Sequence, residues 1–315
     1  MIALASQPRA GEWELSAAWF ARRAAATARS RVHYAPPSLL RQLAWQVRPS
    51  DFAHDALGVD LDPWQTALLH GAHRRCLVNA NRQAGKTFCA SIVVAHRALF
   101  RPGSTILAVA PSQRQSKLLI RAVRSELRAS RIAGTLAVDN VHELELANES
   151  RVIGLPANED TIRGYPKPDL IVVDEASRVS DGIFTALTPM QATNFETASF
   201  WAISTPWGRR GWWWNEWETG GADWHRVRMP ATECPRITPA FLARERRSMG
   251  DLRFRAEYLC EFTETEGTVF PQERIRAAMQ TDVAPLFSPV GPAPLVVPTH
   301  PGVAPLFPAG ARGVA

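Results

Sequence analysis

The sequence contains little cysteine and no long hydrophobic segment. Its four cysteines, Cys76, Cys89, Cys234 and Cys260, show no paired spacing of the kind that binds metals. Cys76 and Cys89 lie in apolar stretches and are expected to be core residues, which fits a reducing cytoplasm. No stretch has the length of a transmembrane helix, and the N-terminus lacks the apolar region of a signal peptide. These absences argue against a membrane or secreted protein and against a cysteine-based zinc site.

Acidic residues are fewer than basic ones. The 315 residues include 36 Lys and Arg against 30 Asp and Glu, which gives a formal net charge of +6. Such an excess mildly favours a polyanionic partner. The alternative is that Arg is simply the common basic residue of a GC-rich genome, and composition does not decide between the two. The length allows one large domain or two ordinary ones.

Strand-like and helix-like segments alternate through the middle of the chain. Residues 1–60 are expected to be a helical region, and residues 61–265 are expected to form the main domain. The alternation predicts an α/β fold with a mostly parallel sheet flanked by helices. Residues 143–153 alternate apolar and polar side chains and predict a hairpin or edge pair. The predicted strands are 76–78, 105–109, 171–173, 200–204 and 224–229, and the predicted helices are 87–100, 113–130, 238–250 and 251–262.

The composition changes towards the C-terminus. Residues 266–282 are expected to be a linker. Residues 283–315 form a Pro-rich tail that contains no acidic residue and repeats Val-Ala-Pro-Leu-Phe. Such a segment cannot build a regular core, so we expect it to be disordered. It is either a partner-binding segment or a non-functional end.

The segment from Asn81 to Thr87 carries the strongest chemical signal. Its sequence, Asn-Arg-Gln-Ala-Gly-Lys-Thr, follows a predicted strand and precedes a predicted helix. Together they describe a phosphate-binding loop, in which backbone N–H groups and the helix dipole hold phosphate oxygens. Lys86 is expected to reach the β- and γ-phosphates of ATP, and the Thr87 hydroxyl to bind Mg²⁺. The expected nucleotide-binding residues of this loop are Ala80, Asn81, Arg82, Gln83, Ala84, Gly85, Lys86 and Thr87.

Two carboxylates follow a second apolar strand. Asp174 and Glu175 come directly after the run Leu-Ile-Val-Val at 170–173. Ligands bind outside the carboxyl ends of strands in open α/β sheets. Asp174 is therefore expected to hold Mg²⁺, and Glu175 to orient and deprotonate an attacking water. The alternative is a strand that ends in two solvated acids.

Two weaker signals accompany these motifs. Ser204-Thr205-Pro206 follows a third apolar strand, where small hydroxyl groups can sense a γ-phosphate, although this sequence is also a common turn. Gln65 precedes the loop, and its amide can pair with both a donor and an acceptor on an adenine edge. A glutamine at this place can equally be a surface residue.

These four elements, in their order along the chain from Gln65 to Pro206, resemble the ATPase domain of the large terminase subunit of tailed bacteriophages and prophages. The resemblance covers roughly residues 61–279. The loop of that family often departs from the common pattern as this one does, with Ala80 in place of the first Gly and Arg82 inside the loop. The resemblance implies a P-loop NTPase fold of the RecA/ASCE-like type and a cis-acting role for Arg82 on the transferred phosphate. It also matches Asp174 to the metal-binding acid, Glu175 to the catalytic acid, Gln65 to the adenine side, and Ser204, Thr205 and Pro206 to the motif that couples hydrolysis to DNA movement.

The resemblance implies an ATP-hydrolysing, Mg²⁺-dependent motor subunit that packages double-stranded DNA into a procapsid in the bacterial cytoplasm. Its partners would be a terminase small subunit, a portal protein and further copies in a ring. Large terminases typically continue into an RNase-H-like nuclease domain. We expect no nuclease activity here, because no set of Asp residues for two metals follows residue 282. The chain would then be truncated or decayed, or the nuclease would be encoded separately.

Aromatic and basic residues form two further clusters. Helical spacing makes Trp213 and Trp217 expected core residues, whereas interleaved arginines allow contact with DNA. The first cluster contains Trp207, Arg209, Arg210, Trp212, Trp213, Trp214 and Trp217. The second, expected on one helix face that is either solvated or turned to DNA or a neighbouring subunit, contains Arg121, Arg124, Arg128 and Arg131.

Two alternatives remain at this stage. A superfamily-two helicase also pairs a Gly-Lys-Thr loop with Asp-Glu, but it needs a second RecA-like domain, and too little chain follows Met229 to build one. A decayed prophage remnant would bind a partner without turnover, although Lys86, Thr87, Asp174 and Glu175 are all in place. The candidates for an arginine that acts across a ring interface are Arg163, Arg209 and Arg210.

Overall fold

A computed structural model describes residues 38–263, apart from 72, 131, 133–135 and 163, together with Ala278. Most of the expected N-terminal region, the expected linker and tail, and the candidate Arg163 therefore lie outside the described residues. The chain divides into two compact units, Met1–Thr268 and Val269–Ala315, and the description concerns the first.

Within the described residues, an eight-stranded sheet has the order β3-β4-β5-β2-β6-β7-β1-β8. Across the sheet, all neighbouring strands in the series β5-β2-β6-β7-β1-β8 are parallel, whereas the pairs β3-β4 and β4-β5 are antiparallel. The mostly parallel sheet predicted from the sequence is thereby confirmed. The strands are β1 Arg75–Ala80, β2 Thr105–Ala110, β3 Leu136–Asp139, β4 Glu143–Leu146, β5 Arg151–Pro156, β6 Leu170–Asp174, β7 Ser199–Ser204 and β8 His225–Met229.

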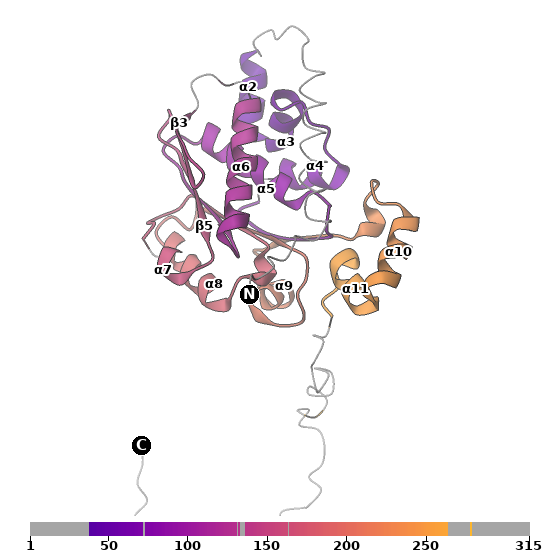
Figure 1. Ribbon diagram of the computed structural model, residues 1–315. Helices are drawn as coiled ribbons and strands as arrows, with labels where there is room; N and C mark the ends of the chain where they lie inside the picture. The colour runs from indigo at the N-terminus through magenta and orange to yellow at the C-terminus, as the bar shows by residue number, and fades with distance from the viewer. Residues whose placement is uncertain are drawn as a thin grey trace, which may run out of the picture. The chain divides into compact units, whose positions relative to one another are not determined.

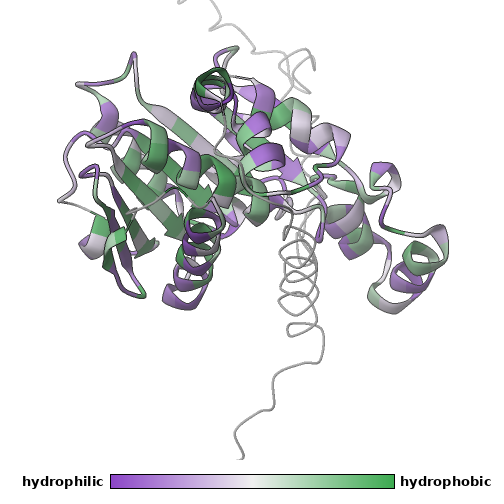
Figure 2. Ribbon diagram, turned by 90° about the horizontal axis from the view of Figure 1, so that it is seen from above, coloured by the Kyte–Doolittle hydropathy of each residue, from purple (hydrophilic) through white to green (hydrophobic). Residues whose placement is uncertain are grey.

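The central strands are apolar because both faces of the sheet are covered. Every residue of β6 and of β7 is buried. Leu77 belongs to the core on one face and Val78 to the core on the other, as the alternation of a strand requires. The first core packs α5 and α6, and the second packs α8 and α9. Figure 1 shows α2 to α6 on one side of the sheet and α7 to α9 on the other, and Figure 2 shows apolar strands between more polar helices.

The helices follow the predicted pattern closely. Ser112 caps α6 by accepting a hydrogen bond from the Gln115 amide, and Thr238 caps α10 in the same way with Phe241. The α-helices are α2 Leu39–Val47, α3 Pro49–Asp51, α4 Pro63–His70, α5 Lys86–Phe100, α6 Gln113–Ala129, α7 Glu159–Ile162, α8 Asp181–Leu187, α9 Gly211–Glu218, α10 Pro239–Met249 and α11 Asp251–Leu259. Shorter helical turns are η1 Phe52–Ala56, η2 Ala176–Arg178, η3 Thr188–Gln191 and η4 Ala231–Glu233.

The predicted hairpin at 143–153 exists, but its second strand is not at an edge. β4 pairs antiparallel with β5, and β5 also pairs parallel with β2. β5 is interior because it supplies four consecutive buried residues, Val152 to Leu155, whereas β4 buries only every second one. The edge beyond it is formed by β3.

None of the helices in the described part of the chain combines the length and apolar character needed to cross a membrane.

Candidate nucleotide-binding site

The predicted phosphate loop lies between the end of β1 and the start of α5. Gly85 precedes α5 with φ +92°, a left-handed conformation that favours glycine. A Cβ at Gly85 would lie 2.6 Å from the Gln65 amide nitrogen, so the close approach of α4 also requires glycine. Glycine at position 85 is therefore needed for the turn itself, before any ligand is considered.

Lys86 is buried at the first position of α5. Its Nζ donates to the carbonyl oxygens of Ala80 and Asn81, at 3.0 and 3.1 Å. The ammonium group is thus held over the loop by the loop's own backbone. Phosphate oxygens are acceptors of the same kind with more negative charge, so this position suits a cation that binds a nucleotide.

Asp174 and Thr87 meet although they are 87 residues apart. The Thr87 hydroxyl donates to Asp174 Oδ2 at 3.0 Å. This contact forms because β6 and β1 are separated only by β7, and their carboxyl ends lie at the same edge of the sheet. The Asp174 side chain is 6% exposed. Burial and the neighbouring charge of Glu175 raise its pKa to about 6, against the opposing effects of Thr87 and Lys86.

These two side chains fit a magnesium ion. A threonine hydroxyl and a carboxylate are hard oxygen donors, which Mg²⁺ prefers. A nearby cation would also relieve the burial of the Asp174 charge. The expected ligands Thr87 and Asp174 are therefore brought together by the fold.

Glu175 follows β6 in a left-handed conformation, with φ +52°. Such a conformation is strained for a residue with a side chain, and strain of this kind gathers at functional sites. Its amide donates to Asp174 Oδ1 at 3.0 Å.

The predicted coupling motif lies beside the turn that follows Glu175. Ser204, Thr205 and Pro206 are all buried. Ser204 Oγ accepts from the Ser177 amide at 3.1 Å and donates to Ser177 Oγ at 2.8 Å. The ends of β6 and β7 are thus linked through side chains as well as through the sheet.

Gln65 lies against the loop and is 2% exposed. Its Oε1 accepts from the Asp62 amide at 3.0 Å, and its Nε2 donates to the Ala84 carbonyl at 3.1 Å. Both ends of the amide are engaged with protein in this structure. The pairing of Gln65 with adenine stays a prediction.

Arg82 turns towards α11. Its Nε lies 3.6 Å from Glu257 Oε2, and its amide donates to the Glu257 carbonyl at 3.1 Å. The guanidinium group is thus paired with a carboxylate rather than directed at the loop. Its role on the transferred phosphate stays a prediction.

The sequence motifs do not reveal that the end of β8 and the residues after it form hydrogen bonds with the phosphate loop. Arg236 donates to the Ala84 carbonyl at 2.9 Å and pairs with Asp62 at 2.7 Å. Asn81 Nδ2 donates to the Met229 carbonyl at 2.9 Å. These partners are far from the loop in sequence, and no local pattern marks them. Met229 at the end of β8 and Arg236 between η4 and α10 therefore help to hold the loop in place.

Several members of the two clusters of basic and aromatic residues contact other parts of the protein. Trp213 is buried as expected, and Trp217 is partly buried against the same core. Arg124 and Arg128 both pair with Asp139 of β3. The Trp207 ring is exposed and lies under Arg178.

A strand, a Gly-Lys-Thr loop and a helix, with a buried aspartate opposite the threonine, define a P-loop NTPase. The chain belongs to the family described as terminase large subunit, T4likevirus-type, N-terminal, whose model matches residues 77–277. This family membership favours the terminase interpretation over the helicase alternative. A search of curated proteins found no match.

Solved structures show the same fold. The ATPase domain of the large terminase of Thermus phage P74-26 is 22% identical, with a TM-score of 0.60 over 69% of this chain and 99% of that one. The large terminase of bacteriophage HK97 is 16% identical, with a TM-score of 0.58 over 69% of this chain and 55% of that one. A large terminase of a thermophilic bacteriophage, in complex with ADP, is 11% identical, with a TM-score of 0.53 over 70% and 53% of the two chains. The chain thus spans about half the length of the latter two.

Proposed function

We propose that this chain is the ATP-hydrolysing motor subunit of a phage or prophage terminase, which drives double-stranded DNA into a procapsid. The observation that carries the proposal is the 3.0 Å contact between Thr87 and Asp174 in a chain of the terminase family. It brings the end of the phosphate loop to the acidic strand, which is what hydrolysis of a Mg²⁺-bound nucleotide requires. The similar terminase in complex with ADP supports a nucleotide at this site.

Each residue of the site has a separate proposed role in hydrolysis. Lys86 and the loop amides hold the phosphates, and in doing so Lys86 exchanges the carbonyls of Ala80 and Asn81 for phosphate oxygens. Glu175 positions the attacking water and accepts its proton. Thr87 and Asp174 would hold Mg²⁺, which neutralises phosphate charge when bound.

Arg82 is proposed to stabilise the charge of the transferred phosphate in cis. To do so its guanidinium group must leave Glu257, which it contacts at 3.6 Å. The contact is long and the arginine side chain is largely exposed, so the pair holds it weakly. Ser204, Thr205 and Pro206 are proposed to transmit the state of the site to the DNA-moving parts, since Ser204 already contacts the turn after Glu175.

The proposed partners follow from the terminase family: double-stranded DNA, a terminase small subunit, a portal protein and further copies of this chain in a ring. The net charge of +6 is compatible with DNA as a partner. We also propose that this chain by itself does not cut DNA. Metal-dependent cleavage of plasmid DNA by the purified protein would contradict that part of the proposal.

The proposed function is tested by measuring Mg²⁺-dependent ATP hydrolysis by the purified chain, with and without double-stranded DNA. We expect hydrolysis that DNA stimulates and that Lys86→Ala abolishes. Absence of hydrolysis under both conditions, or full activity of Lys86→Ala, would contradict it.

A further inference from the structure

An exposed arginine and an exposed tryptophan are stacked beside the candidate site. The guanidinium carbon of Arg178 lies 3.1 Å from the centroid of the Trp207 ring, and Trp207 is 38% exposed. Arg178 belongs to η2, directly after the acidic strand, and Trp207 directly follows Ser204-Thr205-Pro206. A cation over the face of tryptophan is the most favourable form of this contact.

Hydrogen bonds lie close to this stack along the chain, between the turn after β6 and the end of β7. Arg178 ends the 3₁₀ turn that begins at Glu175, because its amide donates to the Glu175 carbonyl at 2.9 Å. One residue earlier, Ser177 contacts Ser204 through its amide and its hydroxyl. The turn after the acidic strand is thus joined to the end of β7 by Ser177–Ser204, and to the residues that follow β7 by Arg178–Trp207 at the surface.

The charge of Arg178 interacts with charged side chains of the site and of α11. It is attracted by Glu257 and by Glu175, and repelled by Arg82. Glu257 in turn pairs with Arg82 of the phosphate loop. Glu257 therefore attracts both the loop arginine and Arg178, and Arg178 is also attracted by the proposed catalytic glutamate.

Glu175 needs support of this kind. Its left-handed backbone, with φ +52°, persists only when the surroundings determine it. A carboxylate that orients a water must also be held closely, since a misplacement of about 1 Å can slow a reaction by about 10²-fold. The turn Glu175–Arg178 is short, so the place of Arg178 affects the place of Glu175.

We infer that Arg178 and Trp207 are a positioning pair for hydrolysis: Trp207 holds Arg178, and Arg178 holds the turn and the charge of Glu175. The inference rests on the proposed function, since it requires Glu175 to act on ATP. It assigns Trp207 an effect on turnover through Arg178.

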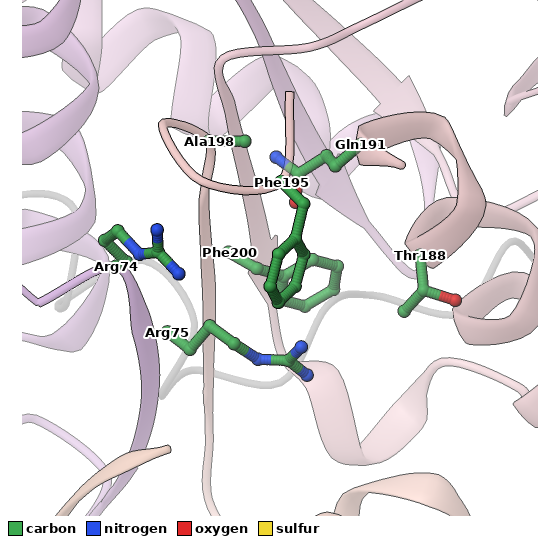
Figure 3. Close-up of a pocket in the computed structure, with 7 residues that line it drawn as sticks. All are labelled: Arg74, Arg75, Thr188, Gln191, Phe195, Ala198 and Phe200. Atoms are coloured by element: carbon green, nitrogen blue, oxygen red, sulfur yellow. The ribbon is translucent and has the colours of Figure 1, made fainter. Parts of the chain in front are cut away.

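The test compares Trp207→Ala with Trp207→Phe and with a control variant at the opposite, N-terminal end of the parallel strands. There Arg74 lies 5.5 Å from the centroid of Phe195, which is 49% exposed, beside a hollow at the start of β1 and β7 (Figure 3). Phe195→Ala therefore removes an exposed aromatic ring from under an arginine without touching the site. The measured quantities are kcat and KM for Mg²⁺-ATP and the midpoint of thermal unfolding.

We expect Trp207→Ala to lower kcat by about tenfold or more while KM changes by less than about threefold, because positioning acts on the transition state. Trp207→Phe should restore most of the loss, since a phenyl face also binds a cation. Phe195→Ala should leave kcat unchanged, and both alanine variants should unfold at similar temperatures. A Trp207→Ala variant with wild-type kcat, or a loss of kcat that Phe195→Ala reproduces, would overturn the inference.

A double-mutant cycle shows whether the two residues act together. If they do, Arg178→Gln combined with Trp207→Ala lowers kcat no further than the worse single variant. Losses that multiply would overturn the pairing. Lys86→Ala distinguishes a failure of the inference from a failure of the proposed function. If the wild type hydrolyses ATP and Lys86→Ala does not, a Trp207→Ala variant with unchanged kcat refutes only the inference. A wild-type protein that does not hydrolyse ATP refutes the proposed function itself.

Discussion

The Thr87 hydroxyl lies 3.0 Å from Asp174 Oδ2, so the last residue of the phosphate loop meets the last residue of the acidic strand. The contact makes the proposed metal site a property of the fold.

Thr87→Val keeps the shape of the side chain and removes its hydroxyl. We expect it to lower kcat at saturating Mg²⁺-ATP by about 10²-fold, the usual scale for the loss of one polar contact to reacting groups. Thr87→Ser keeps the hydroxyl and should retain most activity. The measurement is steady-state hydrolysis over a range of Mg²⁺ concentrations. Equal activity of the valine and serine variants would show that the hydroxyl has no part in the reaction.

Gln65→Ala removes an amide whose two ends are engaged with the Asp62 amide and the Ala84 carbonyl. We expect kcat/KM to fall for both ATP and GTP, because the variant loosens the loop, and to fall further for ATP, because Gln65 is predicted to pair with adenine. Stability should fall by about 1–3 kcal/mol, since a buried amide loses its partner. Thr66→Ala, the next residue of α4, is the control. Equal losses for ATP and GTP would contradict the adenine-pairing role.

Glu257→Gln releases Arg82 from its carboxylate partner. If Arg82 acts on the phosphate, this variant should keep or raise kcat, whereas Arg82→Ala should lower it by about 10³-fold or more, as for other arginines that stabilise phosphoryl transfer. Glu261→Gln, which breaks the surface pair with Arg255 near the end of α11, is the matched control. An inactive Glu257→Gln together with an active Arg82→Ala would reverse the roles assigned to these residues.

His96 predicts a pH dependence of stability. Burial lowers its pKa from 6.5 to about 4, with Arg97 and Arg101 acting in the same direction. The ring is therefore neutral in the folded protein, and its Nε2–H donates to the Trp45 carbonyl at 2.6 Å. Because the unfolded chain binds the proton more readily, stability is fully present above pH about 6.5 and falls as the pH approaches 4, by up to about 3 kcal/mol.

The measurement for His96 is the unfolding free energy between pH 7.5 and 4, for the wild type and for His96→Gln. The glutamine variant lacks the titrating group, so its stability should fall less steeply over this range. Identical slopes for the two proteins would show that His96 does not contribute to the acid sensitivity.

Most of the fold could be predicted because its signals are local. The strand 170–173 is a run of apolar residues, and the loop from Asn81 to Thr87 has a sequence that only a tight turn before a helix explains. The position of β5 was harder, because alternation predicts a hairpin but not which other strand pairs with it. Pairing partners depend on the whole sheet rather than on the segment.

The site could be predicted only where a motif carries its own chemistry. Thr87 and Asp174 follow from their motifs, and the structure joins them. Arg236 and Glu257 could not be found, because an arginine or glutamate in a polar helical segment looks like any solvated residue until the chain returns to the loop. Gln65 was recognised from its place before the loop, yet the contacts of its amide depend on tertiary packing.

In the proposed mechanism, Lys86 holds the nucleotide and Glu175 activates the water that hydrolyses it. This mechanism is tested most directly by measuring ATP binding and ATP hydrolysis in Glu175→Gln and Lys86→Ala beside the wild type. We expect Glu175→Gln to bind Mg²⁺-ATP as the wild type does but to hydrolyse it at least about 10²-fold more slowly, while Lys86→Ala loses hydrolysis entirely. Undiminished hydrolysis by Glu175→Gln would contradict it.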